Sequence, residues 1–539
     1  MKSNILVYVF SVLGGIGILF GCKKSYLAET PYSSYSPATL TDSLGFEAAV
    51  DGMYYQVSLY YTYSDHQGWP GVWQVGTDVA FATQPEGIEV PYYNYATLIS
   101  TDVAANFEWT WAYKLISDAN SIIANIESPN VKGLSASTIA DIDGEAHFMR
   151  GYAYEQLAIC FGGVPLVTKP LTAPKTDYVR ASLDSVNAQI AADLQFAASN
   201  LPDITAVPKN SAGPMYGRAN KYMAMQELAE CYIRMKQFAQ AEQQTQAIIN
   251  SGQFSLVNKR YGVHTSLPGD PFSDMFVYGN QRRSQGNTEA IWVLEQQNPS
   301  NVPGGSSGSG QQRRNWGAAY YKETGMAICD SLGGRGIGRM RLSNWVLYNL
   351  YDNGDMRNSE WNIRRHYWYN DPTQPSLFGK PVPYNNSDTI YIICPHTTKW
   401  FCFDPNDVFG YATIKDYMIM RLGETYLLQA EAQVGEGHTT DAAASINALR
   451  TRANAPLVSA GQMTLDFVLD ERARELIGEE NRRMTLMRTG TLVKRVQALN
   501  STSVVNPVTN LTDKALLLPI PQNEIYLNKD AVLTQNPGY

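Results

Sequence analysis

Two widely separated segments of the chain each predict a pair of amphipathic helices joined by a short turn. In residues 216–250, apolar residues recur at three- and four-residue steps on both sides of a turn at 236–238. The second pair occupies 417–434 and 440–452, with a Gly-Glu-Gly turn between its helices. A helix with one apolar face must bury that face against a neighbour. The pattern therefore predicts a helical scaffold made of stacked pairs.

Helical periodicity recurs along much of the remaining sequence. Further helices are expected over 44–60, 106–127, 138–160 and 182–200, and two more within 465–499. The two pairs resemble tetratricopeptide units, although their wide separation excludes a regular repeat array. A chain of 539 residues is long enough to bury a large core. The predicted fold class is mainly α, with a tetratricopeptide-like scaffold and a loop-rich, partly β insert.

The insert corresponds to residues 258–412, which are rich in Gly, Pro, Tyr and Trp. Only short β-like runs stand out there, at 290–294 and 389–393, and the Gly/Ser tract 303–310 predicts a flexible loop. Long loops within a compact protein usually carry function. We therefore expect a helical region over 41–257, a loop-rich ligand-binding region over 258–412, and a C-terminal helical region over 413–539.

The N-terminus predicts export and lipidation. A basic start precedes an apolar run over residues 5–20, which is shorter than a membrane-spanning helix requires. The run ends Gly21-Cys22, the pattern of a bacterial lipoprotein signal, although an ordinary secretory signal is the alternative. We expect 1–21 to be a signal peptide, Cys22 the lipid attachment site and 22–40 a tether. The mature protein would then be anchored to a membrane rather than inserted in it.

Composition and motifs argue against several functions. The 42 basic and 50 acidic residues give a net charge of −8, which is unlike a nucleic-acid-binding protein. The cysteines and histidines fit no zinc spacing, and no metal or cofactor is expected. The Gly-x-Ser-x-Gly match at 304–308 lies in a Gly/Ser tract rather than between a strand and a helix. No catalytic residue is therefore predicted.

Five motifs in order resemble the SusD/RagB family of outer-membrane, nutrient-binding lipoproteins. They are Tyr26-Leu27 with Pro31 after Cys22, EAHFMRGYAYEQLAICFGGVPL at 145–166, RLGETYLLQAEAQ at 421–433, ERARELIGEENRRMTLMRTG at 471–490, and the ending LLLPIPQNEI…LTQNPGY. Arg150, Arg421 and Glu424 lie in apolar helical segments of these motifs. Charges in such places usually pair within the protein, so we expect them to be structural.

The resemblance implies a function and a partner. The protein would be a lipid-anchored outer-membrane protein, facing the cell exterior, that captures an oligosaccharide or polysaccharide. It would pass this ligand to a SusC-like TonB-dependent transporter without chemical change. Three alternatives stay open: a peptide or other nutrient as ligand, with Arg313 and Arg314 available for charged groups; a glycan-degrading enzyme; and a transporter lid with no ligand of its own.

Aromatic residues outside the helical periodicity are the candidate ligand contacts. A flat aromatic ring covers the apolar face of a sugar, while polar side chains reach its hydroxyl groups. The resemblance favours an early loop and the loop-rich middle, and the candidates there are Trp69, Trp73, Tyr92, Tyr93, Arg314, Trp316, Tyr320 and Tyr321. A further aromatic segment spans 361–369. By contrast, Trp109, Trp111, Trp292 and Trp400 follow helix or strand patterns and are expected in the core.

Overall fold

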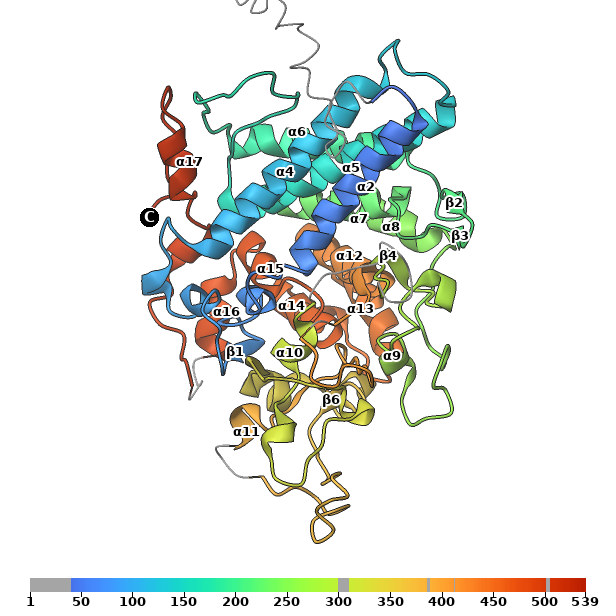
Figure 1. Ribbon diagram of the computed structural model, residues 1–539, viewed down its shortest axis with the longest axis vertical. Helices are drawn as coiled ribbons and strands as arrows, with labels where there is room; N and C mark the ends of the chain where they lie inside the picture. Colours follow the sequence, from blue (N-terminus) through green and yellow to red (C-terminus); the bar gives the residue numbers. More distant parts are fainter. Residues whose placement is uncertain (1–39, 299–309, 385–387, 412, 501–504) are drawn as a thin grey trace, which may run out of the picture.

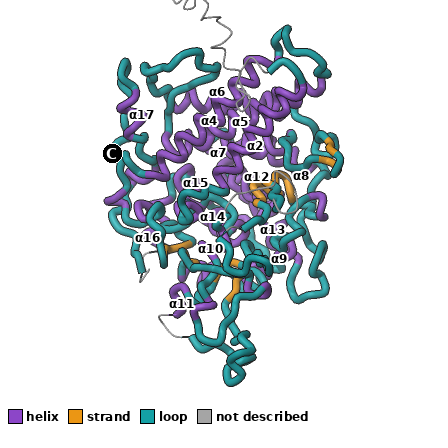
Figure 2. Tube along the Cα trace, in the orientation of Figure 1, coloured by secondary structure: helices purple, strands orange, loops and turns teal. Residues whose placement is uncertain are grey.

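The computed structural model describes residues 40–298, 310–384, 388–411, 413–500 and 505–539. The expected signal peptide, Cys22 and nearly all of the expected tether lie outside these residues. Long helices fill one end of the molecule and loops fill the other (Figures 1 and 2). The mainly α fold class predicted from the sequence is confirmed.

The N-terminal helices form a bundle in which successive helices pack against one another. They are α2 (Ser43–Tyr61), α4 (Val103–Ile126), α5 (Ala136–Phe161), α6 (Leu183–Asn200), α7 (Lys221–Arg234) and α8 (Phe238–Asn250). Side chains accept backbone N–H bonds at most of their starts, as Asp102 does from Ala105 and Ser135 does from Thr138. Trp109 and Trp111 of α4 are buried, as predicted.

The two helix pairs expected from the sequence stack directly on each other. The C-terminal helices are α12 (Leu422–Glu436), α13 (Thr439–Arg452), α14 (Leu465–Leu476), α15 (Arg482–Arg488), α16 (Leu492–Leu499) and α17 (Gln522–Leu527). Helix α12 lies against α8, with Gln429 bonded to Gln246 and Gln433 bonded to Glu242, both at 2.7 Å. The order α7, α8, α12, α13 thus forms one continuous layer across a large gap in sequence.

Short antiparallel strand pairs join distant segments. The pairs are β1 (Ala80–Ala82) with β5 (Met340–Leu342), β2 (Lys209–Asn210) with β3 (Gly213–Pro214), β4 (Ala290–Leu294) with β8 (Tyr417–Arg421), and β6 (Ile363–Arg364) with β7 (His396–Thr397). The strand expected at 290–294 is confirmed, and Trp292 within it is buried, as is Trp400.

Three local predictions are wrong. Residues 417–421 form β8 rather than the first turn of a helix, because the apolar run Tyr417–Met420 pairs with β4. Residues 389–393 fall largely in the short helix α11 (Asp388–Tyr391) instead of a strand. The segment 465–499 contains three helices rather than two, since Gly478 and Gly490, both with positive φ, end α14 and α15 early.

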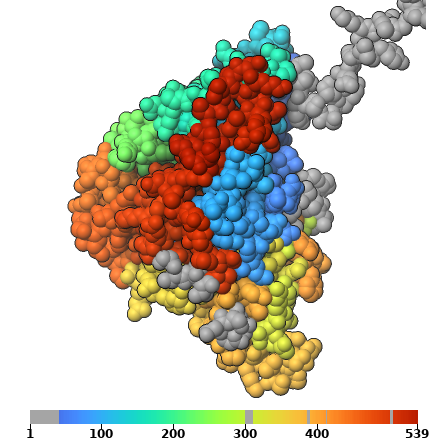
Figure 3. All heavy atoms as spheres, turned by 90° about the vertical axis from the view of Figure 1, so that its left-hand side faces the viewer, coloured from blue at the N-terminus to red at the C-terminus, as the bar shows by residue number. Residues whose placement is uncertain are grey.

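The C-terminal segment returns across the N-terminal half of the molecule, and the space-filling view shows the two side by side (Figure 3). Arg483 N–H bonds to the Trp73 carbonyl, and Leu518 N–H bonds to the Cys160 carbonyl. The remaining short helices are α3 (Trp69–Val72), α9 (Pro271–Asp274) and α10 (Gln312–Trp316). Helix α10 packs against α3, so the early loop and the loop-rich middle meet.

Candidate ligand-binding site

The charged residues of the family-like motifs are held in buried ion pairs. Glu475 accepts hydrogen bonds from Arg357 and Arg421 and pairs with Arg452, and all four side chains are buried. Burial alone would raise the pKa of Glu475, but Arg452, Arg421 and Arg357 hold it well below its usual range. The structural roles expected for Arg421, and likewise for Arg150 on Asp193 and Glu424 on Arg472, are confirmed.

Trp69 and Trp73 line a cavity of about 120 Å³, whose other walls include residues of α5, α7 and β8. Each indole is only 2% exposed; Trp69 Nε1 donates to the Tyr60 carbonyl, and Trp73 Nε1 has no partner among the described residues. The lining also includes Glu227, whose pKa is raised well above its ordinary value by burial and by Glu230. The contact of Trp69 and Trp73 with a ligand stays a prediction.

Four other predicted contact residues also face inward. Tyr92 Oη donates to Asp102 at 2.7 Å, and Tyr320 Oη donates to the Gly334 carbonyl at 2.9 Å. The Trp316 indole is 0% exposed, and Tyr93 is buried. All four side chains are buried, and their contact with a ligand stays a prediction.

Arg314 and Tyr321, also predicted, belong to a cluster that the fold assembles from distant loops; Arg314 itself is buried, and the other members reach the surface. We call this cluster the arginine surface; its residues are Arg314, Tyr321, Arg335, Arg339, Phe409 and Tyr411. The Arg314 guanidinium lies 4.3 Å from the centre of the Tyr411 ring, and that of Arg335 lies 5.4 Å from the same ring. Arg335 also lies 5.8 Å from the Tyr321 ring and 5.9 Å from the Phe409 ring.

Gln67 connects the arginine surface to the early loop. Its side-chain oxygen accepts hydrogen bonds from Arg314 at 2.8 Å and from Arg339 at 2.9 Å. Its backbone carbonyl accepts a third bond, from Asn315 at 2.7 Å. The loop that leads into α3 is thus fastened to both the helix α10 and the segment before β5.

The arginine surface combines hydrogen-bond donors with open aromatic rings. Tyr411 is 57% exposed and Phe409 is 65% exposed, while Arg335 and Arg339 are half-buried. Burial, together with the neighbouring Arg339 and Arg335, lowers the pKa of Arg314 to about 10. Arg314 therefore remains charged at neutral pH. Exposed rings beside fixed donors are the features that a sugar-binding surface requires.

Sequence reasoning missed four members of this surface: Arg335, Arg339, Phe409 and Tyr411. The signals were present, since Arg335 and Arg339 lie in a Gly-rich stretch, and Phe409-Gly410-Tyr411 places two aromatics around a glycine. Nothing in the sequence spacing, however, shows that residues near 314, 335 and 411 meet. Long-range packing brings them together.

A second exposed aromatic group lies in the segment 361–369. Trp361 is 39% exposed and Trp368 is 49% exposed, and Tyr384 contacts the ring of His366. His366 Nδ1 lies 2.5 Å from a Glu360 carboxylate oxygen. This group can offer ring faces to a sugar, and Arg364, whose guanidinium lies 6.0 Å from the centre of the Trp361 ring, adds a hydrogen-bond donor beside them.

A separate hollow of about 340 Å³ lies between α4, residues 165–178 and the C-terminal segment. Trp109, Tyr113, Tyr178 and Glu524 contribute to its walls. Burial raises the pKa of Glu524. The mostly apolar lining distinguishes this hollow from the arginine surface.

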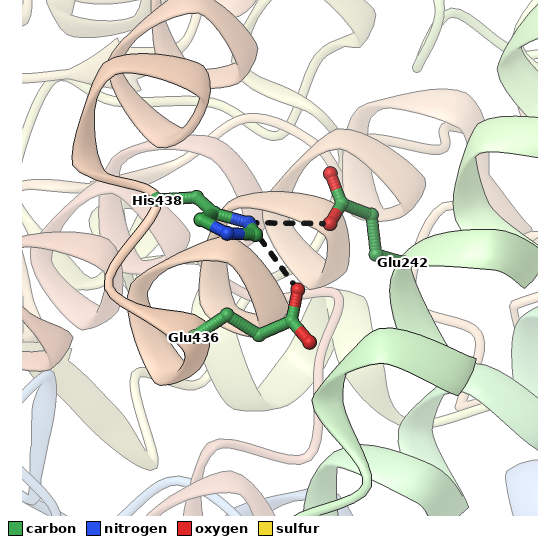
Figure 4. Close-up of side chains that lie close together, drawn as sticks. All are labelled: Glu242, Glu436 and His438. Atoms are coloured by element: carbon green, nitrogen blue, oxygen red, sulfur yellow. Dashed lines mark ion pairs between the residues drawn. The ribbon is translucent and has the colours of Figure 1, made fainter.

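Glu242, Glu436 and His438 form a small cluster at the turn between α12 and α13 (Figure 4). His438 Nδ1 lies 3.3 Å from Glu436 and 3.8 Å from Glu242. The other carboxylate oxygen of Glu242 accepts a bond from Gln433. These contacts fasten the turn to α8, and they account for the cluster without a metal.

A mainly α scaffold of stacked helix pairs, carrying a loop-rich lobe with an aromatic and arginine-rich surface, defines a class of ligand-binding protein. Two family models match the chain: the SusD family over residues 272–539, and a family described as starch-binding and associating with the outer membrane over 25–233. The chain belongs to the SusD/RagB family, as its motifs predicted.

Relatives match over nearly the whole chain. SusD-like proteins P25 and P38 of Formosa agariphila are 24% and 23% identical; the matches cover 98% and 96% of this chain and 97% and 96% of theirs. Among solved structures, a laminarin-binding SusD-like protein has a TM-score of 0.67 at 23% identity, covering 93% of this chain and 100% of that one. Surface glycan-binding protein A from Bacteroides thetaiotaomicron has a TM-score of 0.70 at 18% identity, with the same coverage.

The comparisons also bear on the membrane. The description of the N-terminal family model points to association with the outer membrane. Within the described residues, none of the helices combines the length and apolar character needed to cross a bilayer.

Proposed function

We propose that the protein is a cell-surface lipoprotein that captures a glycan and passes it to a SusC-like TonB-dependent transporter. Membership of the SusD/RagB family supports this role, as do the glycan-binding names of two structural neighbours. Lipidation at Cys22 would hold the protein at the outer membrane, facing the exterior. The transporter would receive the ligand unchanged, since the role proposed here is binding without bond chemistry.

The arginine surface is the proposed glycan site. The observation that carries this choice is the exposure of Tyr411 and Phe409 beside Arg314 and Arg335. Aromatic rings stack on the apolar faces of sugars, and guanidinium groups donate to hydroxyl or charged oxygens. The early loop and the middle region both contribute, which agrees with what the family resemblance implies for the ligand platform.

Calorimetry on the soluble chain from residue 23 tests the proposal. Laminarin and a panel of neutral and charged polysaccharides would be titrated, and the same mixtures analysed for cleavage products. Binding without cleavage, weakened about tenfold or more by Tyr411→Ala, is expected, since one lost stacking contact is worth about 1–2 kcal/mol. Tyr526→Ala, at an equally exposed tyrosine on α17, is the matched control. Cleavage products, or equal loss in both variants, would contradict the proposal.

Anchoring and delivery have separate tests. Cys22→Ala should move the protein from the membrane fraction to the soluble fraction in cells that lack the transporter. Retention in the membrane would contradict lipidation at Cys22. Copurification of the wild-type protein with a TonB-dependent transporter would support the delivery role, and its consistent absence from such complexes would oppose it.

A peptide is the second candidate ligand. The unpaired guanidinium groups of Arg314 and Arg335 favour it, because a peptide carboxylate fits an arginine fork. A peptide mixture in the same calorimetric experiment separates the two ligands. Binding heat in the titrations with peptides, and none in those with glycans, would favour a peptide over a glycan as the ligand.

A further inference from the structure

We infer that the ligand of the arginine surface is an anionic glycan, whose sugars carry carboxylate or sulfate groups. This choice rests on the glycan-binding function proposed above and narrows its substrate class. It follows from the charge, hydrogen bonding and surroundings of four arginines: Arg313, Arg314, Arg335 and Arg339.

All four guanidinium groups bond to neutral oxygens. Arg313 donates to the carbonyls of Cys402 and Gly410, and Arg335 donates to the carbonyl of Phe409. Arg314 donates to the side-chain oxygens of Gln67 and Gln311, and Arg339 donates to Gln67 and to the Gln84 carbonyl. Throughout the described part of the chain, none of these four forms an ion pair with a carboxylate. Neutral oxygens orient the cations but leave the positive charge uncompensated.

The hydrogen-bonding capacity of these arginines is also incomplete. Arg313 and Arg314 are 4% and 3% exposed, and the Nε atoms of all four arginines are buried without a hydrogen-bond partner among the residues that the structure describes. A buried cation that lacks a counterion is costly, and natural proteins rarely retain one without a use. A carboxylate or sulfate placed over the cluster would supply the missing negative charge.

The cations also repel one another. Besides burial, the nearness of Arg339 and Arg335 lowers the pKa of Arg314. Arg314 and Arg339 both donate to the side-chain oxygen of Gln67, so their two guanidinium groups are held close together. The ligand atom that relieves such repulsion best is an anionic oxygen.

The acidic residues nearby do not cancel the charge. Asp407 is exposed and attracts Arg313 without forming an ion pair. Glu89 is buried near Arg339, but its carboxylate accepts backbone N–H bonds from Glu86 and Gly87 at 2.8 and 3.0 Å. Burial raises the pKa of Glu89, although these backbone hydrogen bonds and the charge of Arg339 act in the opposite direction. The arginine surface is therefore locally positive on a chain whose net charge is −8.

The aromatic rings distinguish a glycan from a small free anion. Tyr411 and Phe409 expose large ring areas next to Arg335. An inorganic anion gains nothing from those rings, whereas a sugar bearing an acidic group can stack on a ring and meet a guanidinium together.

Four probes test the inference on the soluble chain from residue 23: a sulfated galactan, its desulfated form, polygalacturonate and its carboxyl-reduced form. Laminarin serves as the neutral reference. Arg335→Gln is the main variant, because Arg335 is half-buried and is held by a bond to the Phe409 carbonyl and by contacts with the rings of Tyr321, Phe409 and Tyr411. Arg283→Gln is its matched control: Arg283 is also half-buried, bonds to the Gln253 carbonyl, and lies over Tyr216 and Phe254 outside this surface. Circular dichroism verifies folding.

At least one charged polymer is expected to bind about tenfold or more tightly than its neutral counterpart, and Arg335→Gln should remove about tenfold of that affinity. Arg283→Gln should change it less than about twofold. The sulfated and uronate pairs show which acidic group is recognised. Equal binding of charged and neutral forms, with loss in Tyr411→Ala, would overturn the inference and keep the glycan function. Failure of every glycan to bind would overturn both.

Discussion

Two of the regions in which arginine side chains are buried differ in what surrounds the charge. Around Glu475, the guanidinium groups of Arg357, Arg421 and Arg452 each meet carboxylates that are themselves fully buried. Arg314 of the arginine surface and the neighbouring Arg313 are also buried, but they bond only to neutral oxygens among the described residues. Burial is thus shared, and the two regions differ in whether a carboxylate compensates the buried charge.

The largest effect is expected in the paired region. Glu475→Gln removes the charge shared by three arginines and should lower the free energy of unfolding by about 3–5 kcal/mol. Urea denaturation of the soluble chain measures it. Glu436→Gln makes the same chemical change on α12, where the carboxylate faces only the exposed His438, and should cost less than about 0.5 kcal/mol. Similar losses in both variants would show that the network contributes no special stability.

The second-largest effect is expected when the pH is lowered, which should reduce the stability that the buried ion pairs provide. The pKa values of Glu471, Glu475, Glu480 and Asp78 are lowered in the folded protein, despite burial, by neighbouring arginines. Their contribution is complete above about pH 4.5, the unfolded value for Glu, and is lost as pH falls further. The free energy of unfolding should therefore drop by several kcal/mol between about pH 4.5 and 3. A smaller drop is expected in Glu475→Gln, and an identical acid profile would contradict the assignment.

A buried carboxyl group without a neighbouring cation should show the opposite pH dependence, with stability falling as the pH rises. Glu108 on α4 is 0% exposed and has no cation partner among the described residues, and burial raises its pKa to about 8 against the opposing effect of the Tyr60 hydroxyl. Between about pH 4.5 and 8 the unfolded chain ionises this group while the folded protein keeps it protonated, so stability falls as pH rises. Glu108→Gln should stabilise the protein by about 1–3 kcal/mol at pH 7 and by much less at pH 5. A gain that does not change with pH would point to packing instead.

The smallest effect on stability is expected at the arginine surface. Arg335 has no ion pair among the described residues and lies beside like charges, so Arg335→Gln should change the free energy of unfolding by less than about 0.5 kcal/mol. The same variant should weaken binding of the charged polymers. Thermal unfolding measures the change in stability and calorimetry measures the change in binding, both on one preparation of the variant. A large loss of stability would place Arg335 with the structural arginines.

Much of the fold could be predicted from the sequence because its helices are long and periodic. The segments 44–60, 106–127 and 138–160 correspond closely to α2, α4 and α5. The errors fall where local sequence is ambiguous. Residues 417–421 are apolar throughout, and only their pairing with β4 makes them a strand.

The ligand site was harder to predict for a physical reason. Trp73, Trp316 and Tyr320 lie in or beside helical segments of three to five residues, which are too short for periodicity to separate an inward from an outward ring, and all three are buried. Arg314 and Tyr321 were identified, whereas Arg335 and Tyr411 depend on contacts between distant segments. The unpaired state of these arginines is a property of three-dimensional packing, and no count of charges along the chain reveals it.

The stacking of α8 on α12 sets an order for biogenesis. Helix α8 ends at Asn250, but the helix that covers it begins at Leu422. During synthesis, the side of α8 that packs on α12 therefore stays uncovered until the segment 422–436 is available. Contacts between segments so far apart in sequence form late in folding, and apolar surface that stays exposed until then favours aggregation. The time that α12 needs to reach α8, rather than the local propensity of either helix, therefore sets how long this surface is exposed.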